Sequence, residues 1–212
     1  MKTTIPQHLL NIQAVTLSPE EPYTWSSGMK SPIYCDNRLI IAYPEIRKQV
    51  AEELATLIQN HYPEADLIAG TATAGIPHAA FVAEQMNLPM CYVRSSAKAH
   101  GKAKQIEGLT EKSKKAVVVE DLISTGKSSI QSVLALREAG IEVLGVVAIF
   151  SYGLKKADDA LGNIDITFQT VTNFSTLIEE AQESGTISEQ GLSLLKEWQQ
   201  DPEHWGAASF SK

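Results

Sequence analysis

The sequence predicts an α/β fold with a central, mainly parallel sheet of about five strands flanked by helices. First, short runs of β-branched apolar residues occur without alternation, which is typical of strands buried on both faces of a parallel sheet. Second, segments with helical apolar spacing separate these runs, as βαβ crossovers require. Third, polar turns follow several of the runs, at the sheet edge where open α/β folds bind ligands.

The segments before this alternation form smaller predicted elements. Residues 4–14 predict a short helix, and residues 43–60 predict a longer one with an apolar stripe. Between them, residues 23–38 contain turn residues ahead of the strand-like Ile33-Tyr34-Cys35. This pattern favours a hairpin or partial strand pair outside the main alternation.

The alternation itself then predicts strands and helices in order. The strand candidates are residues 66–70, 89–94, 116–120, 143–150 and 166–171, and the helix candidates are 75–87, 125–139 and 153–161. After residue 172 the spacing predicts two more helices, with Gly185 as the break. We interpret residues 1–212 as one domain, with a core at about 43–171 and additions at about 1–40 and 172–212.

Composition excludes several classes of protein. The 212 residues carry a formal charge of -7, which argues against general binding to nucleic acid or to an anionic membrane. The chain has no apolar run of about 18 residues and begins without the apolar segment of a signal peptide. Cys35 and Cys91 lack metal-ligand spacing, so we expect buried free thiols in a reducing cytoplasm rather than a disulfide.

The stretch 116–129 has the clearest chemistry. A buried strand runs into Glu120 and Asp121, whose carboxylates can accept hydrogen bonds from vicinal hydroxyls or hold a hard cation. The turn and helix start after them supply hydroxyls and open N–H groups, which favour an anion, at Ser124, Thr125, Gly126, Ser128 and Ser129. A diol beside a phosphate describes a ribose 5-phosphate. A capped helix with merely solvated acids is the alternative.

One superficial match is rejected. Gly126-Lys127-Ser128 resembles the end of a P-loop, but that loop needs a glycine where this chain has Asp121. A carboxylate there would also repel the β- and γ-phosphates of a nucleotide.

Three further segments add to the predicted site. Residues 70–77 form a small-residue turn after a strand, which would suit a second anion or, equally, close helix–sheet packing. Residues 94–108 combine basic residues with small spacers and predict an exposed, mobile loop that closes over a polyphosphate; a solvated surface loop is the alternative. Residues 25–36 offer aromatic rings, hydroxyls and Lys30 to a flat anionic heterocycle.

Together these residues resemble the type I phosphoribosyltransferases, whose PRPP-binding signature is matched by residues 117–126. The runs 23–34 and 70–77 and the basic loop ending at Gly108 make the chain most similar to the orotate-specific branch. The resemblance implies an N-terminal hood and C-terminal helices around the core. It also implies that orotate and PRPP react, with Mg²⁺, to orotidine 5′-monophosphate and pyrophosphate. A homodimer would share the basic loop between its subunits.

The resemblance also assigns roles. Arg94, Lys98 and His100 would contact the pyrophosphate end of PRPP, and Thr73 and Ala74 would lie in the pyrophosphate loop. The ribose 5-phosphate would be held by Glu120, Asp121, Leu122, Ile123, Ser124, Thr125, Gly126, Lys127 and Ser128. Ser124 would also contact orotate. Lys98, Asp121 and Glu120 would be the catalytic residues, while Mg²⁺ would be bound mainly through PRPP rather than by a protein ligand.

The chain departs from the family pattern around the base. Many members carry a lysine at Ser26, an aromatic pair at Tyr34-Cys35, a second basic residue at Ser95 and an arginine near Ser151-Tyr152, and Lys127 replaces a small residue. Lys30 is therefore our hypothesis for the group that holds the orotate carboxylate. The alternatives are a phosphoribosyltransferase for another base, or a non-catalytic PRPP-sensing regulator, which the net acidity disfavours.

Overall fold

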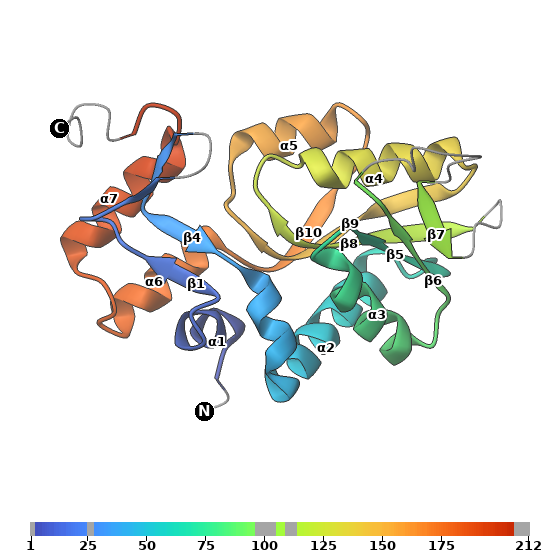
Figure 1. Ribbon diagram of the computed structural model, residues 1–212, viewed down its shortest axis with the longest axis horizontal. Coiled ribbons are helices and arrows are strands. Elements are labelled where there is room, and N and C mark those ends of the chain that lie inside the picture. The colour runs from blue at the N-terminus through green and yellow to red at the C-terminus, as the bar shows by residue number, and fades with distance from the viewer. Residues whose placement is uncertain (1–2, 25–27, 96–104, 109–113, 206–212) are drawn as a thin grey trace.

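The computed structural model describes residues 3–24, 28–95, 105–108 and 114–205 and is built on a six-stranded sheet with the order β10-β9-β8-β5-β6-β7 (Figure 1). The strands are β5 (Leu67–Thr71), β6 (Met90–Val93), β7 (Ile106–Gly108), β8 (Lys115–Ile123), β9 (Glu142–Ser151) and β10 (Phe168–Asn173). All neighbouring pairs are parallel except β6 and β7, which run antiparallel. The predicted α/β class with a mainly parallel sheet is confirmed.

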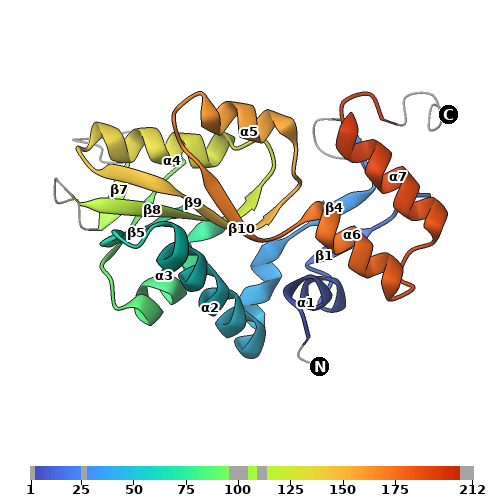
Figure 2. The same cartoon turned by 180° about the vertical axis from the view of Figure 1, so that it is seen from behind.

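Helices cover both faces of this sheet. Helices α2 (Pro44–His61) and α3 (Gly75–Met86) lie on one face, and α4 (Lys127–Glu138) and α5 (Lys155–Gly162) lie on the other (Figures 1 and 2). Strand β8 is central, with Val117 and Val119 in one core cluster and Val118 in the other. Burial on both faces explains its unbroken apolar run. Within the described ranges, no helix combines the length and apolarity needed to span a membrane.

The first and last parts of the chain together form a second lobe, which we call the hood. It contains α1 (Ile5–Asn11), the antiparallel pairs β1 (Val15–Leu17) with β4 (Ile33–Cys35) and β2 (Tyr23–Thr24) with β3 (Lys30–Ser31), α6 (Phe174–Glu183) and α7 (Glu189–Gln200). The 3₁₀ helix η1 (Asn37–Ala42) leads from the hood into α2. Figure 2 shows α1 beside α6, and the Thr4 hydroxyl donates to the Glu180 carboxylate at 2.8 Å.

The edge strand and the end of β8 differ from the sequence-based expectation. Residues 106–108 were expected in an exposed loop, but they form the edge strand β7, where Ile106 is only 6% exposed. A single apolar residue in three is too short a pattern to reveal a strand. Strand β8 also continues past Glu120 to Ile123, because Leu122 and Ile123 still pair with β9. Both cysteines are free, as expected, although Cys35 is only half-buried.

Candidate active site

A small cavity lies where β8 leads into α4. Gly126 precedes the helix with φ +75°, a left-handed conformation that glycine adopts without strain. The cavity has a volume of about 270 Å³ and is lined by Leu122, Ser124, Thr125, Gly126, Lys127, Ser128 and Gln131. The first N–H groups of a helix lack partners inside it and, with the helix dipole, attract anions. The cavity therefore has the chemistry of a phosphate site, as the sequence predicts.

Glu120 is anchored beside this cavity rather than solvated. Its side chain is 4% exposed, and its carboxyl accepts hydrogen bonds from the Ser128 hydroxyl at 2.8 Å and the Asp121 N–H at 3.0 Å. Burial, and then the neighbouring Asp121 carboxyl, raise the pKa of Glu120 to about 8. The solvated-acid alternative is therefore wrong for Glu120. The group is held in place and retains its proton near neutral pH.

The hydroxyls of the first helical turn face partly away from the cavity. Ser129 is fully buried, and its hydroxyl lies 3.5 Å from the Glu120 carboxyl oxygen. The expectation that Ser129 offers its hydroxyl to an anion is wrong, because the helical turn directs it toward the sheet. Ser128 is exposed, although its hydroxyl also points to Glu120.

Asp121 is held by a residue that the sequence analysis did not single out. Asn37 is fully buried at the start of η1 and donates its side-chain amide to the Asp121 carbonyl at 2.7 Å. His78 of α3 is buried nearby, where burial lowers its pKa to about 4 against the opposing effect of Asp121. Asn37 thus ties the hood to the carboxyl end of β8. The sequence held no local signal for this, since the pair is 84 residues apart.

The turn between β5 and α3 lies next to the same strand end. It contains Thr73 and Ala74, and a Cβ atom on Gly75 would come within 2.5 Å of the Val119 carbonyl oxygen. Close packing of α3 on β8 therefore requires this glycine, as one of the two interpretations of the turn predicts. The exposed Thr73 and half-buried Ala74 remain available to a ligand.

Of the predicted cationic residues, Arg94 and Lys30 lie within the described part of the chain. Arg94 follows β6 and lies 3.6 Å from Glu107 in β7. Lys30 is in β3 of the hood, where its ammonium donates to the Thr24 hydroxyl at 2.9 Å. Lys98 and His100 lie outside the described residues, so their predicted contacts are not tested by the structure.

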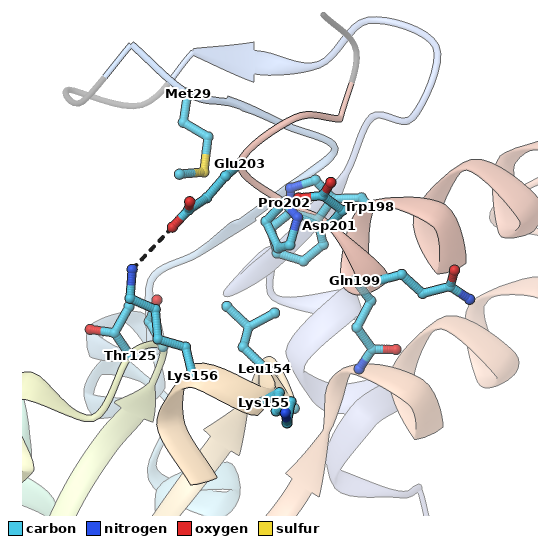
Figure 3. Close-up of a pocket in the computed structure, with 13 residues that line it drawn as sticks. Met29, Thr125, Leu154, Lys155, Lys156, Trp198, Gln199, Asp201, Pro202 and Glu203 are labelled. Atoms are coloured by element: carbon cyan, nitrogen blue, oxygen red, sulfur yellow. Dashed lines mark hydrogen bonds and ion pairs between the residues drawn. The ribbon is translucent and has the colours of Figure 1, made fainter. Parts of the chain in front are cut away.

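A larger cavity of about 520 Å³ adjoins the small one, and Ser124 and Thr125 line both. Figure 3 shows that its walls come from the start of α5 and from the end of α7 with the segment that follows, while Met29 lies at the hood side. The remaining lining residues are Gly153, Leu154, Lys155, Lys156, Trp198, Gln199, Gln200, Asp201, Pro202 and Glu203. Its apolar walls with a few charged groups are typical of small-molecule sites.

Comparisons with known proteins agree with this geometry. Residues 40–177 match the phosphoribosyl transferase domain family. The chain is 58% identical over 98% of its length to an orotate phosphoribosyltransferase of Bacillus caldolyticus, all of which is covered. It is 54% identical over 96% of its length to the enzyme of that name from Bacillus subtilis, of which 94% is covered. The chain belongs to the orotate phosphoribosyltransferases.

Solved structures of this family share the fold. The orotate phosphoribosyltransferase of Aeropyrum pernix superimposes with a TM-score of 0.76 at 26% identity, over 87% of this chain and all of that one. The family and the fold class predicted from residues 117–126 and the flanking segments are therefore confirmed. As an orotate phosphoribosyltransferase, the chain has two adjoining cavities at the edge where the signature strand ends.

Proposed function

We propose that this enzyme transfers the 5-phosphoribosyl group of PRPP to orotate, giving orotidine 5′-monophosphate and pyrophosphate in de novo pyrimidine (UMP) biosynthesis. One observation carries the proposal. Two adjacent carboxyl groups lie near the carboxyl end of the central strand, and after a short turn comes a helix N-terminus with open N–H groups and hydroxyls. The membership of the chain in the orotate phosphoribosyltransferases supports the choice of base.

Different groups would bind the phosphate and the ribose of PRPP. The small cavity would hold the 5-phosphate on the N–H groups of α4. Asp121 and Glu120 would bind the ribose hydroxyls, and the protonated Glu120 can donate to a hydroxyl as well as accept. Catalysis would then have two sources. The site positions the C1 carbon of the ribose between orotate and pyrophosphate, and it stabilises the charge that develops as the bond to pyrophosphate breaks.

Mg²⁺ is the cofactor that we propose. Among the described residues there is no group of three or more side chains able to hold a metal ion, and Glu120 already accepts hydrogen bonds from Ser128 and Asp121. These residues fit a cation carried mainly by the oxygens of PRPP, with Asp121 as the nearby carboxylate, because Mg²⁺ commonly combines substrate phosphates with few protein ligands. When bound, the cation offsets negative charge on the departing pyrophosphate.

The remaining predicted contacts belong to this proposal. Arg94, Lys98 and His100 would meet the pyrophosphate, and Lys30 would face orotate from the hood. A homodimer in which the basic loop reaches the neighbouring site would complete the pocket. The free thiols of Cys35 and Cys91 fit the reducing cytoplasm that we expect for the enzyme.

The test is the loss of orotate absorbance with purified protein, PRPP and Mg²⁺, each omitted in turn. We expect consumption of orotate that requires all three components, with pyrophosphate released in equal amount. Adenine and hypoxanthine in place of orotate serve as control bases. Consumption of one of these but not of orotate would assign another base, and PRPP binding without any turnover would assign a sensor.

A further inference from the structure

The larger cavity is placed to receive the base of a ligand whose phosphate occupies the smaller one. Ser124 and Thr125 line both, so a phosphoribosyl group held at the turn could extend its far end into the 520 Å³ space. Apolar side chains form much of that space, namely Met29, Leu154, Trp198 and Pro202. A flat ring can pack against such walls, but an anionic ring also needs a cation there.

Lys156 lines this cavity and forms an ion pair with another residue that lines it. The Lys156 ammonium, near the start of α5, lies 3.0 Å from the Glu203 carboxylate, which comes from the segment after α7 (Figure 3). These two side chains are 66% and 59% exposed, so the ion pair contributes little to stability and exchanges readily. Glu203 thus shows that a carboxylate can be seated against Lys156 at this cavity.

The other charged groups of the cavity are engaged differently. Lys155 lies 3.9 Å from Asp159 on its own helix, and the Asp201 carboxylate lies 2.9 Å from the imidazole of His204. Lys30 is not among the described residues that line the cavity, and its ammonium bonds to Thr24 within the hood. Lys156 is therefore the cation that bridges the two walls.

We propose that Lys156 binds the carboxylate of the pyrimidine substrate, which takes the place of the Glu203 carboxylate. This inference rests on the proposed function, because it presumes that the base carries a carboxylate. One carboxylate replaces another on the same ammonium, so the net charge around Lys156 is preserved, and Glu203 turns to water. The substrate carboxylate would gain a charge-assisted hydrogen bond from the Lys156 ammonium.

The test compares Michaelis constants of the Lys156→Gln enzyme for both substrates. Loss of an exposed charge-assisted hydrogen bond predicts a KM for orotate raised about fivefold. The KM for PRPP should stay within about twofold, because the phosphate cavity is untouched. Lys156→Arg keeps the cation and should restore most of the orotate affinity. Lys196→Gln removes one exposed positive charge from α7, lines neither cavity, and should leave both constants unchanged.

Two results would overturn the assignment. One is a Lys156→Gln enzyme whose KM for orotate stays within about twofold of the original value. The other is an equal rise in both Michaelis constants accompanied by a lower melting temperature, which would indicate a structural role for Lys156. Either result is distinct from failure of the proposed function, because that failure would appear as an unaltered protein that does not consume orotate.

Discussion

At the scale of single residues, the burial of the Glu120 carboxyl group affects both its protonation and the stability of the protein. It is buried near the carboxyl end of the central strand, bonded to Ser128 and to the Asp121 N–H, and adjacent to a second carboxyl group. Removing a carboxylate from water disfavours its charged form. The chain keeps the proton on Glu120 near neutral pH, and stability must then depend on pH through this group.

We expect Glu120→Gln to remove part of the pH dependence of folding. The pKa of Glu120 rises on folding from 4.5 to about 8, so the favourable contribution is complete below the lower value and is lost as pH rises through the upper one. Across that window the original protein should lose stability relative to the variant, by at most about 1.4 kcal/mol per pH unit. Urea unfolding at a series of pH values measures this, and a difference that stays constant with pH would contradict it.

The sequence predicted the identity of this residue but not its role in the fold. Two acids between an apolar run and a Ser/Thr/Gly turn are a local pattern, so Glu120 and Asp121 could be recognised without coordinates. The buried serine Ser129 and the supporting Asn37 could not, because the rotation of α4 and the contact between η1 and β8 arise only on folding.

At the scale of elements, the packing of α3 against β8 sets the second turn of the site. Gly70 and Gly75 both sit where an added Cβ would crowd α3 or the neighbouring strand. At Gly75 the crowding is against the backbone of Val119, which cannot move without disturbing the central strand. This packing fixes the position of Thr73 and Ala74 at the edge of the sheet.

Gly75→Ala should destabilise the protein by about 1–3 kcal/mol, the usual cost of overpacking a close contact. Gly162→Ala is the matched control, because its Cβ would meet no atom within 4 Å and alanine favours helix. We expect the control to change stability by less than about 1 kcal/mol. Chemical denaturation of both variants measures the difference. Equal stability of the Gly75→Ala variant and the original protein would show that α3 can shift.

Short elements are harder to predict from the spacing of apolar residues than long ones. Long helices such as α2, and β8 with its buried run, were predicted to within a few residues. Strand β7 was missed because three residues with one apolar side chain show no periodicity. Its strand conformation depends instead on pairing with β6. Arg94 was correctly predicted at the end of a strand, but its ion pair with Glu107 of β7 was not predicted.

At the scale of the molecule, hood and sheet share one apolar core. Trp198 of α7 is fully buried, with its ring 5.2 Å from that of Phe174 and 5.5 Å from that of Tyr152, which follows β9. The same cluster includes residues of α1 and α2. The large cavity therefore has a wall whose position depends on the long-range docking of the chain ends.

Trp198→Ala should destabilise the protein by about 3–5 kcal/mol. Because the core is continuous, hood and sheet should still unfold in a single transition, only at lower temperature. Leu134→Ala is the control, since Leu134 of α4 is 48% exposed and should lose little. Calorimetry measures both variants. A separate early transition for the hood would show that the two lobes fold independently.

The sequence by itself determined the fold class, the order of the main elements, the family and the acid–hydroxyl turn, because each can be recognised from local patterns and from their order along the chain. Tertiary structure decided which of these groups meet. The Asn37 contact with Asp121 and the ion pair of Lys156 with Glu203 join residues 84 and 47 positions apart. Such pairs have no sequence period, since they form only when the hood packs on the carboxyl edge of the sheet.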